Sequence, residues 1–305
     1  MSETTHKHHK YSLLVYLLIA NGITWLGWIP GLIIGARQGY IMPNFDTYAE
    51  LFKSGFANTQ HIFLGIAFQL AVYGPLIGGL VATWMDSGKE GLIDLWQRIT
   101  RWNVGGRWYL TALGITALLA GLPVAIFALS GGFTPSTYTI AYILIVFLVQ
   151  LLTSGFGEEP GWRGFLLPCL QARFAGEKAV WMLGLIWAIW HYPLVAIRTL
   201  SMMHDVNVPQ MVITIIVSLA GQTMALIGIA FIYVWLYNKT QSVFLSIVFH
   251  ALCNTLGVWL TSFLAEPQAA TLFIALMPWA VVIFMQKRLG KQNFPGVQTE
   301  KAAQS

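Results

Sequence analysis

Long apolar stretches recur along most of the chain, from Tyr11 to Met285, and short polar segments separate them. The stretches are roughly 20 residues long, which is the length of helix that crosses the hydrocarbon core of a bilayer. The pattern predicts an all-α polytopic membrane helical bundle with about eight transmembrane helices. The predicted spans are residues 11–36, 61–84, 107–130, 139–157, 179–198, 211–237, 242–264 and 269–286.

One shorter amphipathic segment lies between the second and third predicted spans. Residues 91–102 carry Leu92, Leu95, Trp96 and Ile99 at helical spacing, with polar residues between them. A helix with a single apolar stripe of this kind is typical of the membrane interface. We therefore expect an interfacial helix that lies flat on the cytoplasmic surface.

The composition narrows the class of protein further. Hydrophobic residues make up 56% of the chain and charged residues only 10%, whereas a soluble domain has about 25% charged residues. No segment between the spans is long enough to bury a core of its own. Residues 1–305 are therefore predicted to form a single membrane domain whose outer surface contacts the lipid bilayer.

Basic residues are distributed unevenly between the two ends of the predicted spans. Eight spans place both termini on one side, and all but three of the 17 Lys and Arg residues then fall on that side. The exceptions are Arg37, Lys53 and Arg198. Because the basic side faces the cytoplasm, we expect a multi-pass protein of the cell (plasma) membrane with both termini cytoplasmic. The net charge of +5 follows from this topology, and no nucleic-acid partner is expected.

Few charged or strongly polar side chains interrupt the spans in the second half of the chain. They are Glu158, Glu159, Arg163, His191, His250 and Asn254. A charge at mid-membrane costs on the order of 3 kcal/mol, so each needs a partner or a function. Because these residues come from three separate helices, we expect them to converge on one site.

The first group contains Glu158, Glu159 and Arg163. Glu159 precedes Arg163 by four residues, an order that favours a structural ion pair within a helix and leaves Glu158 without a partner. Pro160 and Gly161 are expected to break or restart the helix at this point. The two carboxylates would then lie near a helix N-terminus, where backbone N–H groups favour negative charge.

The other two groups contain histidines. His191 is expected near mid-membrane, roughly 18 Å along its helix, and Pro193 predicts a bend beside it. His250 and Asn254 are four residues apart, so they share one helical face and could donate hydrogen bonds to one point. Taken singly, each group is explained equally well by hydrogen bonds between helices that only fix packing.

Three motifs thus lie in order on spans four, five and seven. They read Glu158-Glu159-Pro-Gly-Trp-Arg163, Trp187-Ala-Ile-Trp-His191 and His250-Ala-Leu-Cys-Asn254. This combination resembles the CPBP or Abi family of intramembrane peptidases, which includes CAAX proteases and bacteriocin-processing enzymes. The resemblance covers roughly residues 145–260. Trp187 is a departure, because the family more often has Phe there.

The resemblance implies a glutamate-type intramembrane endopeptidase that needs no cofactor. Glu158 would be the general base that activates water, aided by His191, while His250 and Asn254 would form the oxyanion hole. The partner would be a peptide or protein substrate at the membrane, although the sequence does not distinguish a prenylated protein from a bacteriocin leader or a signalling peptide.

The same resemblance divides the single domain into three parts. Residues 10–140 hold the N-terminal spans, residues 140–265 form the catalytic core with the three motifs, and residues 266–305 hold the last span and a cytoplasmic tail. Within the core, Glu159 and Arg163 would support the backbone and electrostatics of the first motif.

Three alternatives remain open at this point. His191, His250 and Glu158 would also make a catalytic zinc set, but there is no His-Glu-x-x-His helix, and Asn254 suits an oxyanion better than zinc. A proton-coupled transporter is the main alternative outside the enzymes, although a proton relay favours carboxylates spread across the membrane. The third alternative is a protein that acts by binding, as a membrane scaffold or in bacteriocin immunity.

Overall fold

The computed structural model describes residues 3–203, 206–265 and 271–290, and this part of the chain is built from helices joined by short connections. The α-helices are α1 (Glu3–Gln38), α2 (Tyr48–Ser54), α3 (Thr59–Ala71), α4 (Gly74–Ile99), α5 (Gly106–Phe127), α6 (Ile140–Gln150), α7 (Phe156–Glu159), α8 (Leu167–Arg173), α9 (Lys178–Ser201), α10 (Val208–Thr240), α11 (Val243–Thr261) and α12 (Thr271–Leu289). Three π-helical turns are η1 (Ala128–Gly132), η2 (Leu151–Gly155) and η3 (Pro160–Leu166).

The prediction of a polytopic helical bundle is confirmed, but the number of eight spans is not. Within the described residues, six helical runs are long and apolar enough to cross a membrane. The pair α3 and α4, which meet at a bend of 43°, makes a seventh span if it is taken as one. α12 passes alongside these helices without belonging to that set, and the first residues of the predicted span 269–286 lie outside the described residues.

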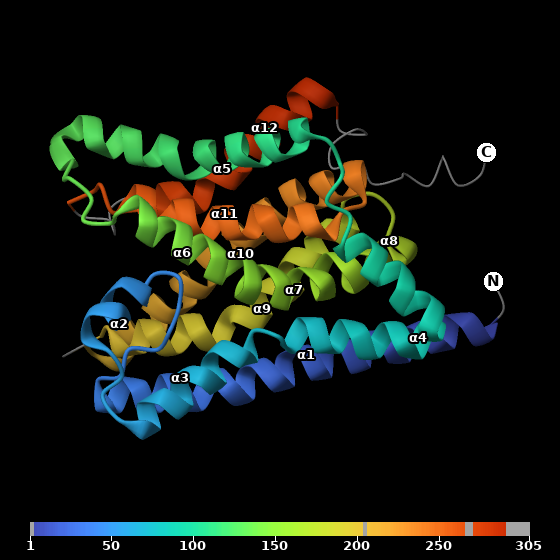
Figure 1. Ribbon diagram of the computed structural model, residues 1–305, viewed down its shortest axis with the longest axis horizontal. Coiled ribbons are helices and arrows are strands. Elements are labelled where there is room, and N and C mark those ends of the chain that lie inside the picture. Colours follow the sequence, from blue (N-terminus) through green and yellow to red (C-terminus); the bar gives the residue numbers. More distant parts are fainter. Residues whose placement is uncertain (1–2, 204–205, 266–270, 291–305) are drawn as a thin grey trace.

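The helices lie along a common axis, and α1 begins at the same end of the bundle at which α12 ends (Figure 1). The three exceptional basic residues belong to α2 and to the C-terminal parts of α1 and α9, which lie together at the opposite end (Figure 1). There Arg198 pairs with Asp46 at 2.5 Å. These three basic residues therefore lie together, away from the end at which α1 begins, while the predicted cytoplasmic tail lies outside the described residues.

The outer surface of this bundle is apolar, unlike the surface of a soluble protein. Large aliphatic side chains such as Leu26 and Leu129 are 79% and 90% exposed on the outside, where lipid would solvate them. The interior combines aliphatic side chains with aromatic and charged groups, and Trp162, Trp190 and Arg163 are among its largest fully buried side chains. The bilayer supplies the apolar solvent, so the bundle interior is free to carry polar chemistry.

The helix that carries the two glutamates does not break at Pro160 and Gly161 as the sequence predicts. Helical structure runs without interruption over Ile140–Arg173 as one 34-residue candidate span, so the predicted end of the span at residue 157 is wrong. The turns η2 and η3 flank the short α7 and absorb the proline in a wider helical turn. π-Turns of this kind inside α-helices are frequently found at functional sites. Glu158 consequently lies in the middle of a span and not at its end.

α9 continues through Pro193, beside which a bend was predicted and stays a prediction. It runs as one helix from Lys178 to Ser201 with Pro193 inside it. The predicted span of residues 179–198 is therefore correct in position and short by a few residues at its C-terminal end.

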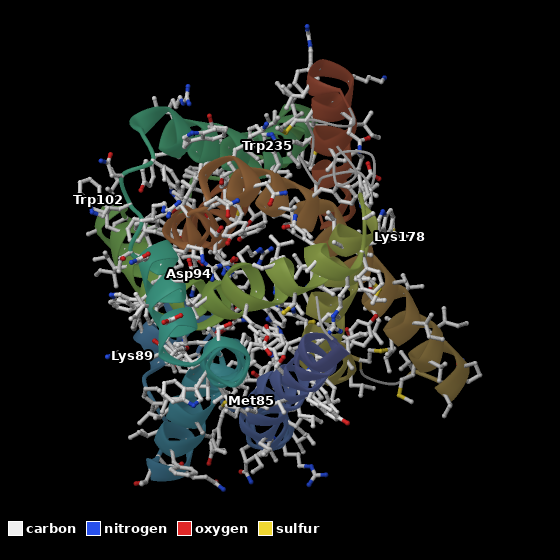
Figure 2. All side chains as sticks on the ribbon, turned by 90° about the vertical axis from the view of Figure 1, so that its right-hand side faces the viewer. Met85, Lys89, Asp94, Trp102, Lys178 and Trp235 are labelled. Atoms are coloured by element: carbon white, nitrogen blue, oxygen red, sulfur yellow. The ribbon has the colours of Figure 1, made fainter. Side chains whose placement is uncertain are left out.

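The amphipathic segment of residues 91–102 is the second half of α4. Gly88 adopts φ 55° and ψ −143° and divides α4 at this point, a backbone conformation that favours glycine. Leu95 and Ile99 beyond the kink are buried in the protein, whereas Trp96 is exposed. Lys89, Asp94 and Trp102 lie at the end of the bundle that faces the viewer in Figure 2. The apolar stripe therefore packs largely against the bundle, and only part of it is free to contact lipid.

Close helix packing places the glutamate-bearing helix against the start of α4. A Cβ atom at Gly161 would collide with the carbonyl group of Pro75, and one at Gly157 would lie 2.9 Å from the carbonyl oxygen of Val72. Only glycine permits the two backbones to approach this closely. The glycines between the motif residues therefore determine how deeply the carboxylates are set in the bundle.

We expect Gly161→Ala to destabilise the protein by about 2 kcal/mol or more, because the added methyl group overpacks a contact with backbone atoms that cannot move aside. Thermal unfolding of the purified protein in detergent would show a lower Tm. Gly114→Ala is the matched control, since nothing lies within 4 Å of a Cβ atom at Gly114 in α5. An unchanged Tm for Gly161→Ala would contradict this account of the packing.

Candidate active site

The candidate site is built from three parts of the bundle that lie next to one another. α7 and η3 supply the glutamates and the arginine, α9 supplies Trp187 and His191, and α11 supplies His250 and Asn254. α11 contacts both α7 and η3, and α9 contacts η3. These helices occupy the middle of the bundle (Figure 1).

Glu158 is buried, with 3% of its surface exposed. Its Oε2 atom accepts hydrogen bonds from the indole N–H groups of Trp162 at 3.3 Å and Trp187 at 3.1 Å. Its Oε1 atom lies 3.9 Å from Nε2 of His250, which is too far for a hydrogen bond. One carboxylate oxygen is therefore fixed by the protein, and the other faces a histidine across a gap.

Glu159 contacts both Arg163, which is cationic, and His250, which can become cationic. Its Oε1 atom accepts from Nη1 of Arg163 at 3.0 Å, and it also lies 2.8 Å from Nδ1 of His250. Because an ionised carboxylate only accepts hydrogen bonds, Nδ1 of His250 is the donor in this contact. The ion pair that the sequence predicts between Glu159 and Arg163 is present, and it also orients the histidine.

Aromatic rings enclose the arginine. The Cζ atom of Arg163 lies 3.8 Å from the centre of the Tyr233 ring and 4.5 Å from the centre of the Trp187 ring. Cation–π attraction is strongest where water is excluded, and Arg163 is completely buried. Its Nε and Nη2 atoms have no hydrogen-bond partner among the described residues, so the rings provide most of the remaining stabilisation of its charge.

His191 lies beside this cluster without being joined to Glu158. Its Nδ1 atom is 2.9 Å from the carbonyl oxygen of Trp187, and its ring packs edge-to-face on Trp190 with centroids 4.6 Å apart. The Trp187 ring is a common neighbour, since it lies 6.0 Å from the rings of both His191 and His250. The described residues contain no hydrogen bond or ion pair between His191 and Glu158.

Asn254 shares a helical face with His250, as predicted, but it has a partner that the sequence analysis missed. Its Nδ2 atom donates to Oε1 of Gln150 at 2.7 Å. Gln150 is the last residue of α6 and is 1% exposed. A glutamine inside an otherwise apolar stretch was a signal that could have identified it. Trp162 and Tyr233 were also missed, because aromatic residues are too common in this chain to stand out.

The zinc alternative requires His191, His250 and Glu158 to surround one ion. Within the part of the chain that the structure describes, no three His, Cys, Asp or Glu side chains are grouped in a way that could hold a metal ion. The Nδ1 atoms of both histidines face protein oxygen atoms, an orientation that metal-bound histidines also adopt and that leaves Nε2 of each ring available. Metal dependence stays a hypothesis for experiment.

Comparison with known proteins agrees with this arrangement of motifs. Residues 138–256 match the family model described as type II CAAX prenyl endopeptidase Rce1-like. The chain is also 29% identical over 150 residues to CAAX prenyl protease 2 of Methanococcus maripaludis, a match that covers 48% of this chain and 51% of that protein. The match thus spans about half the length of the relative. All three motifs fall within the matched segment, and both matches support the resemblance to the CPBP or Abi family, which contains the CAAX proteases.

Proposed function

We propose that the protein is an intramembrane endopeptidase that hydrolyses a peptide bond in a membrane-associated peptide or protein by means of a glutamate-activated water. The observation that carries the proposal is the buried Glu158 carboxylate, whose Oε1 atom faces Nε2 of His250 at 3.9 Å. Because this gap leaves both atoms unbonded to each other, both are available to a reacting molecule. Catalytic groups in a ligand-free site are often this far apart and approach one another only around substrate.

Glu158 is the general base in this proposal. Its Oε1 atom accepts a proton from water as the water oxygen attacks the carbonyl carbon, and the proton then passes to the amide nitrogen as the C–N bond breaks. The indole groups of Trp162 and Trp187 hold the other carboxylate oxygen, so the base does not have to reorganise. His191 assists, because donation from Nδ1 to the Trp187 carbonyl leaves the lone pair of Nε2 for a water molecule.

His250 and Asn254 donate to the negative oxygen of the tetrahedral intermediate. Glu159 accepts from Nδ1 of His250, so a second proton on Nε2 would make this ring a cation that faces the substrate. Two carboxylates, one guanidinium and one doubly protonated histidine together carry no net charge, which suits a site that is shielded from water. Asn254 has a second amide N–H group in addition to the one that Gln150 accepts.

The substrate class is proposed from the name of the matched relative. CAAX prenyl proteases take their name from a C-terminal Cys-aliphatic-aliphatic-X sequence in which the cysteine carries a prenyl group. A farnesylated peptide with this ending is therefore the first substrate to test, with the same peptide lacking the lipid as its comparison. Cleavage of neither peptide by the intact protein in liposomes would contradict the proposed substrate class.

Glu158→Gln should lower cleavage of the farnesylated peptide at least about a hundredfold, because an amide cannot accept the proton of the attacking water. Release of the C-terminal tripeptide from proteoliposomes, followed by mass spectrometry, measures the effect. Glu90→Gln is the matched control, since Glu90 is an exposed residue of α4. Wild-type activity in a folded Glu158→Gln protein would remove Glu158 from the mechanism.

Asn254→Ala should reduce kcat about a hundredfold with little change in KM, because an oxyanion donor acts mainly in the transition state. Steady-state kinetics on the same peptide separates the two constants. Asn238→Ala, on α10 away from the carboxylates, is the control, because Asn238 also pairs with a glutamine, Gln171, at 3.2 Å. A rise in KM with kcat unchanged would instead assign Asn254 to substrate binding.

Removal of metal ions should leave the activity unchanged, since the proposed chemistry uses a carboxylate and hydrogen-bond donors only. The test is cleavage before and after dialysis against a chelator, followed by addition of zinc. Activity that disappears on chelation and returns with zinc would establish the metal-dependent alternative.

A further inference from the structure

We propose that Gln150 is a positioning residue that sets the orientation of the Asn254 carboxamide toward the reacting carbonyl oxygen. This inference rests on the proposed peptidase function and extends its machinery to a residue outside the three motifs. Its basis is the contact between a fully enclosed glutamine and the amide of a motif residue.

The presence of a glutamine at position 150 needs an explanation, because the preceding residues of α6 are apolar. Gln150 follows ten residues of α6 in which apolar and aromatic side chains predominate, and it is 1% exposed. A buried primary amide is costly in a membrane unless it is hydrogen-bonded. Its Oε1 atom accepts the Nδ2–H group of Asn254 at 2.7 Å, across 104 positions of sequence. The cost of burying the glutamine is thus offset by a contact with the site and not by a neighbour on its own helix.

The direction of this hydrogen bond decides what Asn254 can do. An asparagine amide has two N–H donors on nitrogen and acceptors only on oxygen. Gln150 accepts from one of the two N–H groups of Asn254. If the Asn254 carboxamide turned over, its oxygen would face the Gln150 oxygen, and two acceptors would repel each other. The second N–H group then points away from Gln150 at a fixed angle. A freely rotating amide would present its oxygen to the substrate for part of the time and would repel a developing oxyanion.

The helix geometry places Gln150 and the catalytic carboxylate against the same neighbour. Gln150 contacts Asn254 of α11, and Glu158, eight residues later, faces His250 one turn earlier on α11. Eight residues of regular α-helix would turn the two side chains by about 80° relative to each other. The π-turn η2, which lies between them, holds more residues per turn and reduces that angle. The π-turn therefore allows one helix to present both groups to α11.

A second side chain lies near the glutamine on the side of α2. Tyr48 of α2 is buried, and its hydroxyl donates to Oε1 of Gln69 at 3.1 Å. The same hydroxyl lies near Gln150 and Thr153. Gln150 therefore has Tyr48 on one side and Asn254 of α11 on the other.

The test is a kinetic double-mutant cycle with the farnesylated peptide and the full-length protein in liposomes. Gln150→Met preserves the length of the side chain and removes the acceptor, so kcat should fall about tenfold or more with KM unchanged. In the Asn254→Ala background the same substitution should have no further effect on kcat, because Gln150 acts through Asn254. Gln150→Glu, which keeps an acceptor oxygen at the same position, should restore most of the turnover.

The matched control is Gln171→Met, which breaks another hydrogen bond between a glutamine and an asparagine side chain and should leave kcat unchanged. Thermal unfolding of each variant separates lost structure from lost turnover, and Gln150→Ser replaces Gln150→Met if the latter does not accumulate. Independent, additive effects of Gln150→Met and Asn254→Ala, or loss of activity in Gln150→Glu equal to that in Gln150→Met, would overturn the positioning role. Failure of Glu158→Gln to lower cleavage would instead overturn the proposed function itself, so the two failures are distinguishable.

Discussion

The pairing of Glu159 with Arg163 and His250 is the interaction on which the interior of this bundle depends. A guanidinium and a carboxylate are stable inside a membrane only if they neutralise each other and their remaining polar atoms are stabilised. Here one carboxylate oxygen contacts both Arg163 and His250, while Trp187 and Tyr233 cover the guanidinium. Oε1 of Glu159 is thus engaged by two side chains, whereas Oε1 of the adjacent Glu158 faces His250 across a gap of 3.9 Å. Two neighbouring acids of the same type therefore have different surroundings.

The motif helix meets its neighbours through backbone contacts as well as side chains. Gly157 and Gly161 bring it against α4, and Arg98 from the kinked half of α4 donates to the carbonyl oxygen of Gly164 at 2.7 Å and to the hydroxyl of Tyr237 at 2.8 Å. The backbone carbonyl of Gly164, the residue after Arg163, thus accepts a hydrogen bond from the second half of α4. The position of the buried cluster therefore depends on how this half of α4 packs against the bundle.

Hydrophobic periodicity was sufficient to predict the helical class, and the rarity of charge identified the two glutamates, Arg163 and His250, which do lie together. The Glu159–Arg163 pair and the shared face of His250 and Asn254 follow from i,i+4 spacing, which is a local rule. The continuous helix through Pro160 does not, because a π-turn depends on tertiary packing that favours a wider turn over a break. Gln150 and its contact with Asn254 are separated by 104 positions, so sequence spacing carries no information about their pairing. The sequence also could not predict that the described residues contain no hydrogen bond or ion pair between His191 and Glu158, since this depends on how α9 is rotated about its own axis.

The π-turn η2 has a consequence for how this chain can vary in length. In a surface loop, gaining or losing a residue changes little in the fold that the loop connects. Within residues 151–155, removal of one residue would return the helix to ordinary winding, and the seven remaining steps of about 100° would leave Glu158 within roughly 20° of the face that carries Gln150. Insertion of a further residue would instead turn both carboxylates by about 100°, away from α11. Substitution is restricted at Gly155, because a Cβ atom there would lie 2.9 Å from the carbonyl oxygen of Ile247. The bundle can therefore lose a residue at this turn more easily than it can gain one.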